Sequence, residues 1–310
     1  MDARTPFSIA GRRARLAAAL AVAAATLVLG LPGGTPAGDA ADRYVAGGPV
    51  EAREPVLPDR AAAVLATAAG LRARLGLAAP ASSRVEHVAD RLGGAEYDEV
   101  RGLDREGRAI HLQRLDARGR LVAAVTFGWQ VNGGRPLAGG AAAAARARRV
   151  ADDLAFAVTG APDVVAAPDD GGWTASWPRL VDGIPVVGDG TRIELWPDGR
   201  VHAVVRTERE LAARPATLLD ERAARARATT TLAGLFGSAA AEIAVARVTL
   251  AWIAPNDAFD PTAPDAPGST LRLAWVAEAR TTGALAESLR AVKLFLDAGT
   301  GTLLGGDVLR

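Results

Sequence analysis

Three Asp-Gly pairs follow one another within "VDGIPVVGDGTRIELWPDGRV", residues 181–201. Their carboxylates belong to Asp182, Asp189 and Asp198. Carboxylates in close succession are the chemistry of cation sites and of acid–base catalysis. A cation site usually needs a spacing such as D-x-D-x-D-G, which brings the oxygens to one point, and this stretch lacks it. Asp-Gly between alternating apolar residues is instead typical of hairpin turns, because both residues accept positive φ. We therefore predict three turns and no metal site.

The three histidines of the chain offer little catalytic chemistry. His87 follows Ser82 and Ser83, and a base near a hydroxyl is the arrangement of a nucleophile pair. Ser83 with Glu86 also makes an S-x-x-E capping box, which predicts the start of a short helix and explains the serine structurally. His202 alternates with apolar residues of a predicted strand, so we expect it at a solvated strand position.

Sequence signatures of the common hydrolases and nucleotide-binding enzymes are absent. The chain has no H-E-x-x-H, no G-x-S-x-G and no G-x-x-x-x-G-K-[ST], and it contains no cysteine. The stretch "APNDAFDPTAPDAPGS", residues 254–269, carries oxygen donors for Ca²⁺, but prolines and irregular spacing favour a solvated loop. These donors are Asn256, Asp257, Asp260 and Asp265. We therefore predict a protein that is not an enzyme, with no catalytic residues, no cofactor and no metal.

The composition describes a globular chain of several small domains. With 310 residues and 49% hydrophobic content it can bury packed cores, whereas aromatic residues make up only 5%. A formal net charge of +1 excludes strong general attraction to nucleic acid. We expect Trp173, Trp177, Trp252 and Trp275 in the cores. Arginines on the predicted helices can face solvent or contact an acidic partner or lipid head groups; they are Arg146, Arg148, Arg149, Arg222, Arg225 and Arg227.

The first 37 residues have the layout of an export signal. Arg12, Arg13 and other arginines precede the uncharged run Leu16–Leu31, and a "PGGTPAG" breaker follows. As a helix this run would be roughly 24 Å long, which is shorter than the ~30 Å hydrocarbon core of a bilayer. Cleavage after Ala37 or Ala40 fits the small-residue rule, and an uncleaved anchor is the alternative. Both place the body of the protein outside the cytoplasm, with membrane contact only through this segment if it is uncleaved.

The rest of the chain repeats one pattern, a helix rich in Ala and Arg followed by strands with tight turns. This predicts an α+β fold of tandem modules, each a helix packed on an antiparallel meander. Caps support the helices: Asp59 and Gly76 bound the first, and Thr217 with Asp220 makes a capping-box variant at the start of the last. After residues 1–37, the predicted segments are a linker at 38–58, an N-terminal module at 59–130, a second module at 131–215 and a C-terminal module at 216–310. The predicted helices are 59–75, a short one from Ser83, 141–158 and one from Thr217 to about Phe236.

The second module has four predicted strands, near 172–179, 184–187, 191–196 and 200–207. Pro185 has no N–H to give to a ladder, so the strand Ile184–Val187 should be an edge or begin one. An edge strand can accept a strand of another protein. The candidate partner-binding residues are Ile184, Pro185, Val186 and Val187.

The same region resembles the PepSY and thermolysin/fungalysin-propeptide superfamily, which is cystatin-like. The resemblance rests on Trp177, on Gly183-Ile184-Pro185-Val186, on Gly188-Asp189 and on the Asp198-Gly199 turn. "LRLAWVAEA" and "AVKLFLDAGTGTLLGGD" match the way such modules close, so the resemblance covers about residues 140–310. It implies modules with one helix on an antiparallel sheet. It also implies an extracytoplasmic role as a peptidase prosegment, inhibitor or interaction module, and its motif carries no catalytic residue.

These observations favour an exported protein that binds another protein without catalysis, and that restrains an extracytoplasmic peptidase if the resemblance holds for function. Two alternatives stay open. One is an envelope-tethered structural protein with a lipid or polymer ligand. The other is a hydrolase whose site has no recognisable signature.

Overall fold

The computed structural model describes residues 51–90, 96–127, 134–167, 172–256, 259 and 270–309. The chain divides into two compact units, which meet in sequence between Arg209 and Glu210. The predicted signal at 1–37 and most of the predicted linker lie outside the described residues. Within the part of the chain that is described, no helix is both long and apolar enough to span a membrane.

The N-terminal unit begins with a strand, a helix and a four-stranded meander. Helix α3 has Pro58 in its first turn and no side-chain cap, so the predicted Asp59 cap is wrong, but Gly76 ends the helix in the left-handed region with φ 68°. The elements are β1 (Glu51–Pro55), α3 (Pro58–Leu75), β2 (Ser82–Asp90), β3 (Glu96–Leu103), β4 (Ala109–Leu115) and β5 (Leu121–Thr126).

The predicted short helix from Ser83 is wrong, because Ser82–Asp90 forms strand β2. Its residues pair with β1 on one side and β3 on the other, so ladder hydrogen bonds on both sides replace the helical ones. Val85 packs into the core beneath α3, whereas its neighbour Glu86 bonds Arg53 of β1. The period of two thus prevails over a capping pattern that only four residues support. The residues Glu51–Pro55, predicted as linker, form β1 of the same sheet.

The second half of this unit repeats the arrangement of a helix and four strands. The prediction of separate strands at 184–187 and 191–196 is wrong, because one strand, β8, runs through both. The elements are α4 (Gly140–Asp153), β6 (Asp163–Ala166), β7 (Trp173–Val181), β8 (Ile184–Leu195) and β9 (Val201–Thr207).

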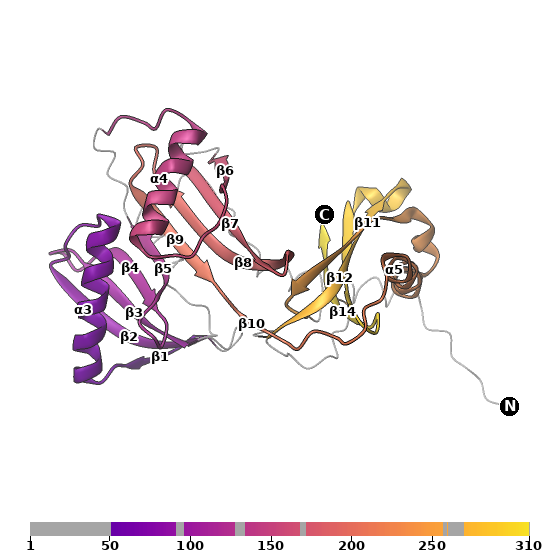
Figure 1. The fold of residues 1–310 in the computed structure, drawn as a ribbon, viewed down its shortest axis with the longest axis horizontal. Helices are drawn as coiled ribbons and strands as arrows, with labels where there is room; N and C mark the ends of the chain where they lie inside the picture. Colours follow the sequence, from indigo (N-terminus) through magenta and orange to yellow (C-terminus); the bar gives the residue numbers. More distant parts are fainter. Residues whose placement is uncertain are drawn as a thin grey trace. The chain divides into compact units, whose positions relative to one another are not determined.

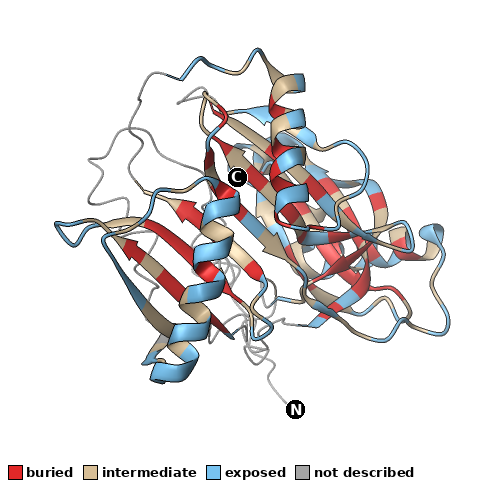
Figure 2. Cartoon of the chain, turned by 60° about the vertical axis from the view of Figure 1, so that its left-hand side comes forward, coloured by how far each residue is buried: buried red, intermediate tan, exposed pale blue. Residues whose placement is uncertain are grey.

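The two halves join through their last strands. Ala123, Ala124 and Val125 of β5 pair antiparallel with Val205, Val204 and Ala203 of β9. One antiparallel sheet results, with the strand order β1-β2-β3-β4-β5-β9-β8-β7-β6. Helices α3 and α4 contact each other and share one hydrophobic core with this sheet (Figure 1). Buried positions gather on the strands and on the helix sides that face them, and the outer sides of the helices are exposed (Figure 2).

The C-terminal unit consists of one helix on a four-stranded meander, with short additions. Helix α5 begins later than predicted: Asp220, expected as the acidic member of a capping box with Thr217, is itself the cap, and its side chain accepts a hydrogen bond from the Ala223 N–H at 2.7 Å. Ala224, Ala228 and Leu232 of the helix pack on the sheet. The elements are β10 (Glu210–Leu211), α5 (Glu221–Phe236), η1 (Gly237–Glu242), β11 (Ile243–Ile253), β12 (Thr270–Thr281), η2 (Gly283–Glu287), β13 (Ala291–Asp297) and β14 (Leu303–Leu309).

The predicted α+β fold class is confirmed. Helices α3, α4 and α5 are each followed by four strands in antiparallel pairing, and β10, which is two residues long, adds to β12 in parallel. Within the C-terminal unit Asn256, just after β11, bonds the last strand through its side-chain amide. Its Oδ1 accepts from the Gly306 N–H at 2.9 Å and its Nδ2 donates to the Gly306 carbonyl at 3.0 Å. A Cβ at Gly305 would lie 2.2 Å from Oδ1 of Asn256, so this close approach requires glycine.

Candidate functional site

Two of the three Asp-Gly pairs form the predicted turns. Asp182 and Gly183 join β7 to β8 with φ values of 53° and 76°, the positive pair that a type I′ turn needs. Asp198 and Gly199 join β8 to β9, with φ 82° at the glycine. Asp198 Oδ1 accepts from the Arg200 N–H at 3.1 Å, which stabilises that turn.

The third pair is not a turn, so that prediction is wrong for Asp189. This residue lies inside β8, and no part of its side chain reaches solvent. Arg179 Nη1 donates to Oδ2 at 3.0 Å, and Arg209 Nε donates to Oδ1 at 2.7 Å. The Arg209 N–H adds a third bond to Oδ2 at 2.7 Å. One buried carboxylate therefore joins β7, β8 and the residue that ends the N-terminal unit.

The glycines on either side make this burial feasible. Gly188 and Gly190 have φ values of 80° and 139°, which side chains rarely tolerate. A Cβ at Gly190 would lie 2.2 Å from the carbonyl oxygen of Trp177. The register between β7 and β8 shifts at Pro178, so a β-bulge accompanies the turned-in carboxylate. In the sequence, glycines on both sides of one aspartate are the signal that separates this pair from the other two.

The candidate partner-binding residues form one strand of the β7–β8 hairpin. Val181 pairs with Ile184 and Leu180 pairs with Pro185. Val186 is 2% exposed, whereas Val187 is 49% exposed and Leu180 is 60% exposed. By register and alternation Leu180, the exposed Pro185 and Val187 share one face. We call these three residues the hairpin patch. That Ile184–Val187 is a sheet edge stays a prediction.

His87 does not lie with the serines that the sequence placed near it. Its Nδ1 is 3.1 Å from Oδ1 of Asp98, which in turn accepts two bonds at its Oδ2 from Arg60 of α3. Ser82 and Ser83 are four or five residues away on the same extended strand, roughly 13–17 Å along its axis. The structure therefore does not bring this histidine and a serine together as a base and nucleophile.

A second buried carboxylate lies on the sheet face opposite α3. The Glu99 side chain has no solvent exposure and is surrounded by three arginines. Arg53 Nη1 donates to Oε1 at 2.8 Å, Arg101 Nε donates to Oε1 at 2.9 Å, and Arg114 Nε donates to Oε2 at 2.9 Å. The Arg114 guanidinium also lies over the Tyr97 ring at 4.5 Å. Sequence reasoning missed this cluster, although "EYDEVRG" places charged residues on a strand whose other face is needed for the core.

A buried histidine lies under α3. His111 is 3% exposed, and among the described residues neither of its ring nitrogens has a hydrogen-bond partner. A Cβ at Gly102 would be 2.3 Å from its ring, so glycine on β3 makes room for the imidazole. Burial lowers the pKa of His111 and the charge of Arg72 on α3 lowers it further. The neutral imidazole is therefore the form that the fold accepts.

His111→Leu is expected to flatten the pH dependence of stability on the acid side. The unfolded histidine has its ordinary pKa of 6.5, whereas the folded pKa is lower. Below 6.5 the unfolded state binds more protons, so the free energy of unfolding falls until the pH passes the folded pKa. The loss is at most about 1.4 kcal/mol per pH unit. Urea unfolding of the wild type and the variant at several pH values from 7.5 to 5 measures this loss. If the free energy of unfolding falls equally with pH in both proteins, His111 is not its cause.

The remaining candidate residues that the structure describes pack against other side chains or bond to neighbouring strands. His202 is half-buried against Trp196, with ring centroids 4.1 Å apart, so the predicted solvated position is wrong. Trp177 belongs to the N-terminal core, Trp173 packs against it, Trp252 is buried, and Trp275 packs on the C-terminal core. Of the oxygen donors weighed for Ca²⁺, Asn256 bonds β14, and Asp257, Asp260 and Asp265 lie outside the described residues. The described residues hold no group of three or more side chains suited to a metal ion.

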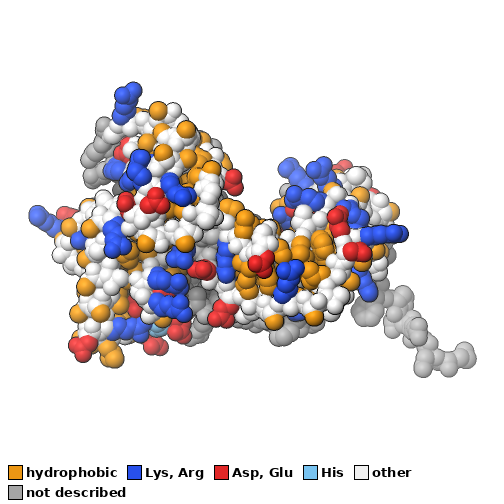
Figure 3. Space-filling model, viewed as in Figure 1, with side chains coloured by type: hydrophobic (Ala, Val, Ile, Leu, Met, Phe, Trp, Pro, Cys, Tyr) orange, Lys and Arg blue, Asp and Glu red, His pale blue; other side chains and the backbone are white. Residues whose placement is uncertain are grey.

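The helix arginines lie on exposed or half-buried surfaces, and Arg146, Arg148 and Arg225 bond within the chain. Arg146 Nε donates to the Gly199 carbonyl at 2.9 Å, and Arg225 Nη1 donates to the Val245 carbonyl at 2.8 Å. On the face seen in Figure 3, basic side chains are scattered and acidic ones lie among them. This distribution differs from the continuous basic stripe of a nucleic-acid surface.

Comparisons with known proteins find similarity among solved structures and none by sequence. No family model and no curated protein match the sequence. Among solved structures the chain is similar to the "Bacillus megaterium YpeB C-terminal domain", at 13% sequence identity and a TM-score of 0.36, over 83% of this chain and 99% of that one. A similarity at that score carries no functional argument. The α+β class is evident from the elements themselves.

Proposed function

We propose that this chain is an exported protein that binds another protein outside the cytoplasm, and that the partner contacts the hairpin patch. The observation that carries the proposal is the exposure of Leu180, Pro185 and Val187 on one face of the β7–β8 hairpin. Apolar side chains that gather on one exposed surface are typical of interaction sites. The export part is supported by the layout of residues 1–37.

The finer proposal is that the partner is a peptidase that the chain restrains. The resemblance of residues 140–310 to peptidase prosegments supports this part. The fold gives it a mechanism, because a hairpin held by the Asp189 cluster at its base presents its apolar face without needing to order first. A pre-organised surface loses less conformational entropy on binding than a flexible segment does.

The hairpin is tested by co-purification of the tagged full chain from separated cytoplasmic, membrane and exported fractions. Val187→Asp should weaken recovery of the bound protein about tenfold or more, which corresponds to about 1.4 kcal/mol. The matched control is Val165→Asp, which changes a valine 65% exposed on β6 and should leave recovery unchanged. Thermal melting checks that both variants fold.

The outcomes separate the parts of the proposal. If both variants recover equal amounts of the bound protein, or if the wild type binds no protein, the hairpin patch is not the binding surface. Recovery only from the cytoplasmic fraction would overturn export. If the bound protein is a peptidase whose turnover of a casein substrate is unchanged by the pure chain, restraint is excluded and simple binding stays.

A further inference from the structure

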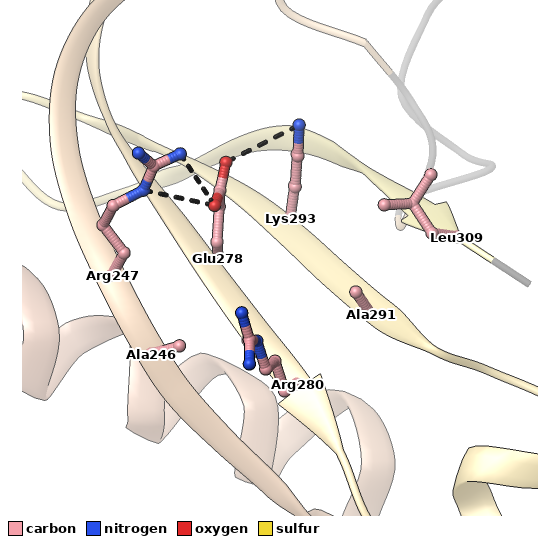
Figure 4. Close-up of a pocket in the computed structure, with 8 residues that line it drawn as sticks. Ala246, Arg247, Glu278, Arg280, Ala291, Lys293 and Leu309 are labelled. Atoms are coloured by element: carbon pink, nitrogen blue, oxygen red, sulfur yellow. Dashed lines mark hydrogen bonds and ion pairs between the residues drawn. The ribbon is translucent and has the colours of Figure 1, made fainter.

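A hollow of about 460 Å³ lies on the sheet of the C-terminal unit. It opens on the face opposite α5, because its charged residues alternate along the strands with those that pack on the helix. The lining comes from all four strands of the meander (Figure 4). Its residues are Ala246, Arg247, Glu278, Ala279, Arg280, Ala291, Lys293 and Leu309.

One row of side chains along this face balances its own charges. Arg247, Glu278, Lys293 and Asp307 stand opposite one another on β11, β12, β13 and β14, so positive and negative residues alternate. Arg247 Nη2 is 2.9 Å from Oε2 of Glu278, and Lys293 Nζ is 3.6 Å from its Oε1. The basic members of this row therefore already face carboxylates.

Arg280 stands in the next row without such a partner. Its neighbours in register are Ala244 on β11 and Ala291 on β13, and Leu309 follows on β14. Arg280 is exposed, and among the described residues it has no ion pair, because the neighbouring Glu278 pairs with Arg247 and Lys293. Figure 4 shows its guanidinium between Ala246 and Ala291. The hollow thus combines one unpaired guanidinium with a floor of small apolar side chains and Leu309 at the rim.

We propose that this hollow binds a carboxylate of a peptide, held by Arg280, with a small apolar side chain on Ala246 and Ala291. A guanidinium binds a carboxylate through two parallel N–H donors, which fixes the direction of the ligand. The volume lies within the range of pockets that hold small ligands, so a few residues of a peptide end fit. A lipid surface is less suited, because a recess does not lie flat on a bilayer.

The site is separate from the hairpin patch and does not rest on it. All its lining residues belong to the C-terminal unit. Val187→Asp should therefore leave peptide binding unchanged, and Arg280→Gln should leave recovery of a hairpin-bound protein unchanged. Failure of one proposal is thus distinguishable from failure of the other.

The test is fluorescence anisotropy of fluorescein-Gly-Ala-Ala-Ala, with a free carboxylate or an amidated end, titrated with the full chain. We expect the free-acid peptide to bind at least about tenfold more tightly than the amide. Arg280→Gln should remove this preference, and Ala291→Leu should weaken binding similarly by filling the floor. Arg222→Gln on α5, an exposed arginine on the opposite face, is the matched control and should change nothing.

Three outcomes would overturn the proposal. These are equal affinity for acid and amide, unchanged binding in both Arg280→Gln and Ala291→Leu, and binding to phosphatidylglycerol vesicles without binding to the peptide. Because Arg280 and Ala291 lie on the surface of the sheet, thermal melting should show both variants folded. If Arg280→Gln unfolds the chain, the Ala291→Leu titration and the comparison of acid with amide still test whether the hollow binds the peptide carboxylate.

Discussion

Asp189→Ala is expected to lower the free energy of unfolding by about 3 kcal/mol, the lower end of what removing one partner from a buried ion cluster costs. The lower end applies because the Asp189 side chain has no exposure, whereas Arg179 and Arg209 are 24% and 29% exposed. Without the carboxylate, two guanidinium groups and the Arg209 N–H lose their acceptor. Water reaches the arginines only partly, so it cannot replace all three bonds.

Equilibrium urea unfolding of the full chain measures this change, with the wild type and the variant at the same pH. Asp153→Asn is the matched control, because this aspartate is exposed at the end of α4 and a surface change there should stay within about 0.5 kcal/mol. A loss no larger for Asp189→Ala than for the control would mean that the cluster contributes no stability. It would then be a feature of specificity alone.

Glu99→Gln is expected to cost about 3–4 kcal/mol at neutral pH, because three arginines then lie together without their buried counter-charge. Those arginines are 21–24% exposed, so solvent screens their mutual repulsion only in part. The amide keeps the shape of the side chain, and the loss therefore reports charge and not a cavity. Glu106→Gln is the control, since Glu106 is 64% exposed beside Arg108 and should cost at most about 0.5 kcal/mol.

The pH dependence identifies the cause of this loss. Burial raises the pKa of Glu99, but hydrogen bonds from Arg53 and Arg101 and the charge of Arg114 outweigh it, so the pKa lies below its ordinary value of 4.5. A depressed carboxyl contributes stability above 4.5 and loses it as the pH falls through the folded pKa. The difference in the free energy of unfolding between the wild type and Glu99→Gln should therefore be constant above about pH 5.5 and become smaller below 4.5. A gap that does not change with pH would refute an electrostatic origin.

Local patterns in the sequence predicted the elements well where one physical preference decided them. Asp182-Gly183 became a type I′ turn because few other residue pairs accept two positive φ values in succession. Gly76 ends α3 because glycine accepts the left-handed conformation that closes the helix. The predicted strands near 172–179 and 200–207 follow period-two alternation and lie within two residues of β7 and β9.

Predictions that depended on distant partners were less accurate. Ser83 and Glu86 match a helix cap, but β1 and β3 pair with this segment from both sides and make it a strand. The sequence indicated Ile184–Val187 as the candidate partner-binding strand, because Pro185 favours a sheet edge and the segment carries the family motif. Which of its residues are exposed, Val187 and Pro185 but not Val186, followed only from the register with β7.

Sequence patterns alone established the α+β class, the recurrence of a helix followed by antiparallel strands, and the positions of most turns. These features depend on backbone preferences and on periodicity, and both act over a few neighbouring residues of the sequence. Three features came only from contacts between distant residues: Asp189 is a buried ion partner and not a turn, β5 pairs with β9, and Arg280 has no carboxylate beside it among the described residues. Such contacts join groups that are far apart in the sequence. Asp189 and Arg209 are 20 residues apart, and Arg53 and Glu99 are 46 residues apart. A residue's type limits the partners it accepts, and the packing of the sheets decides which of them it receives.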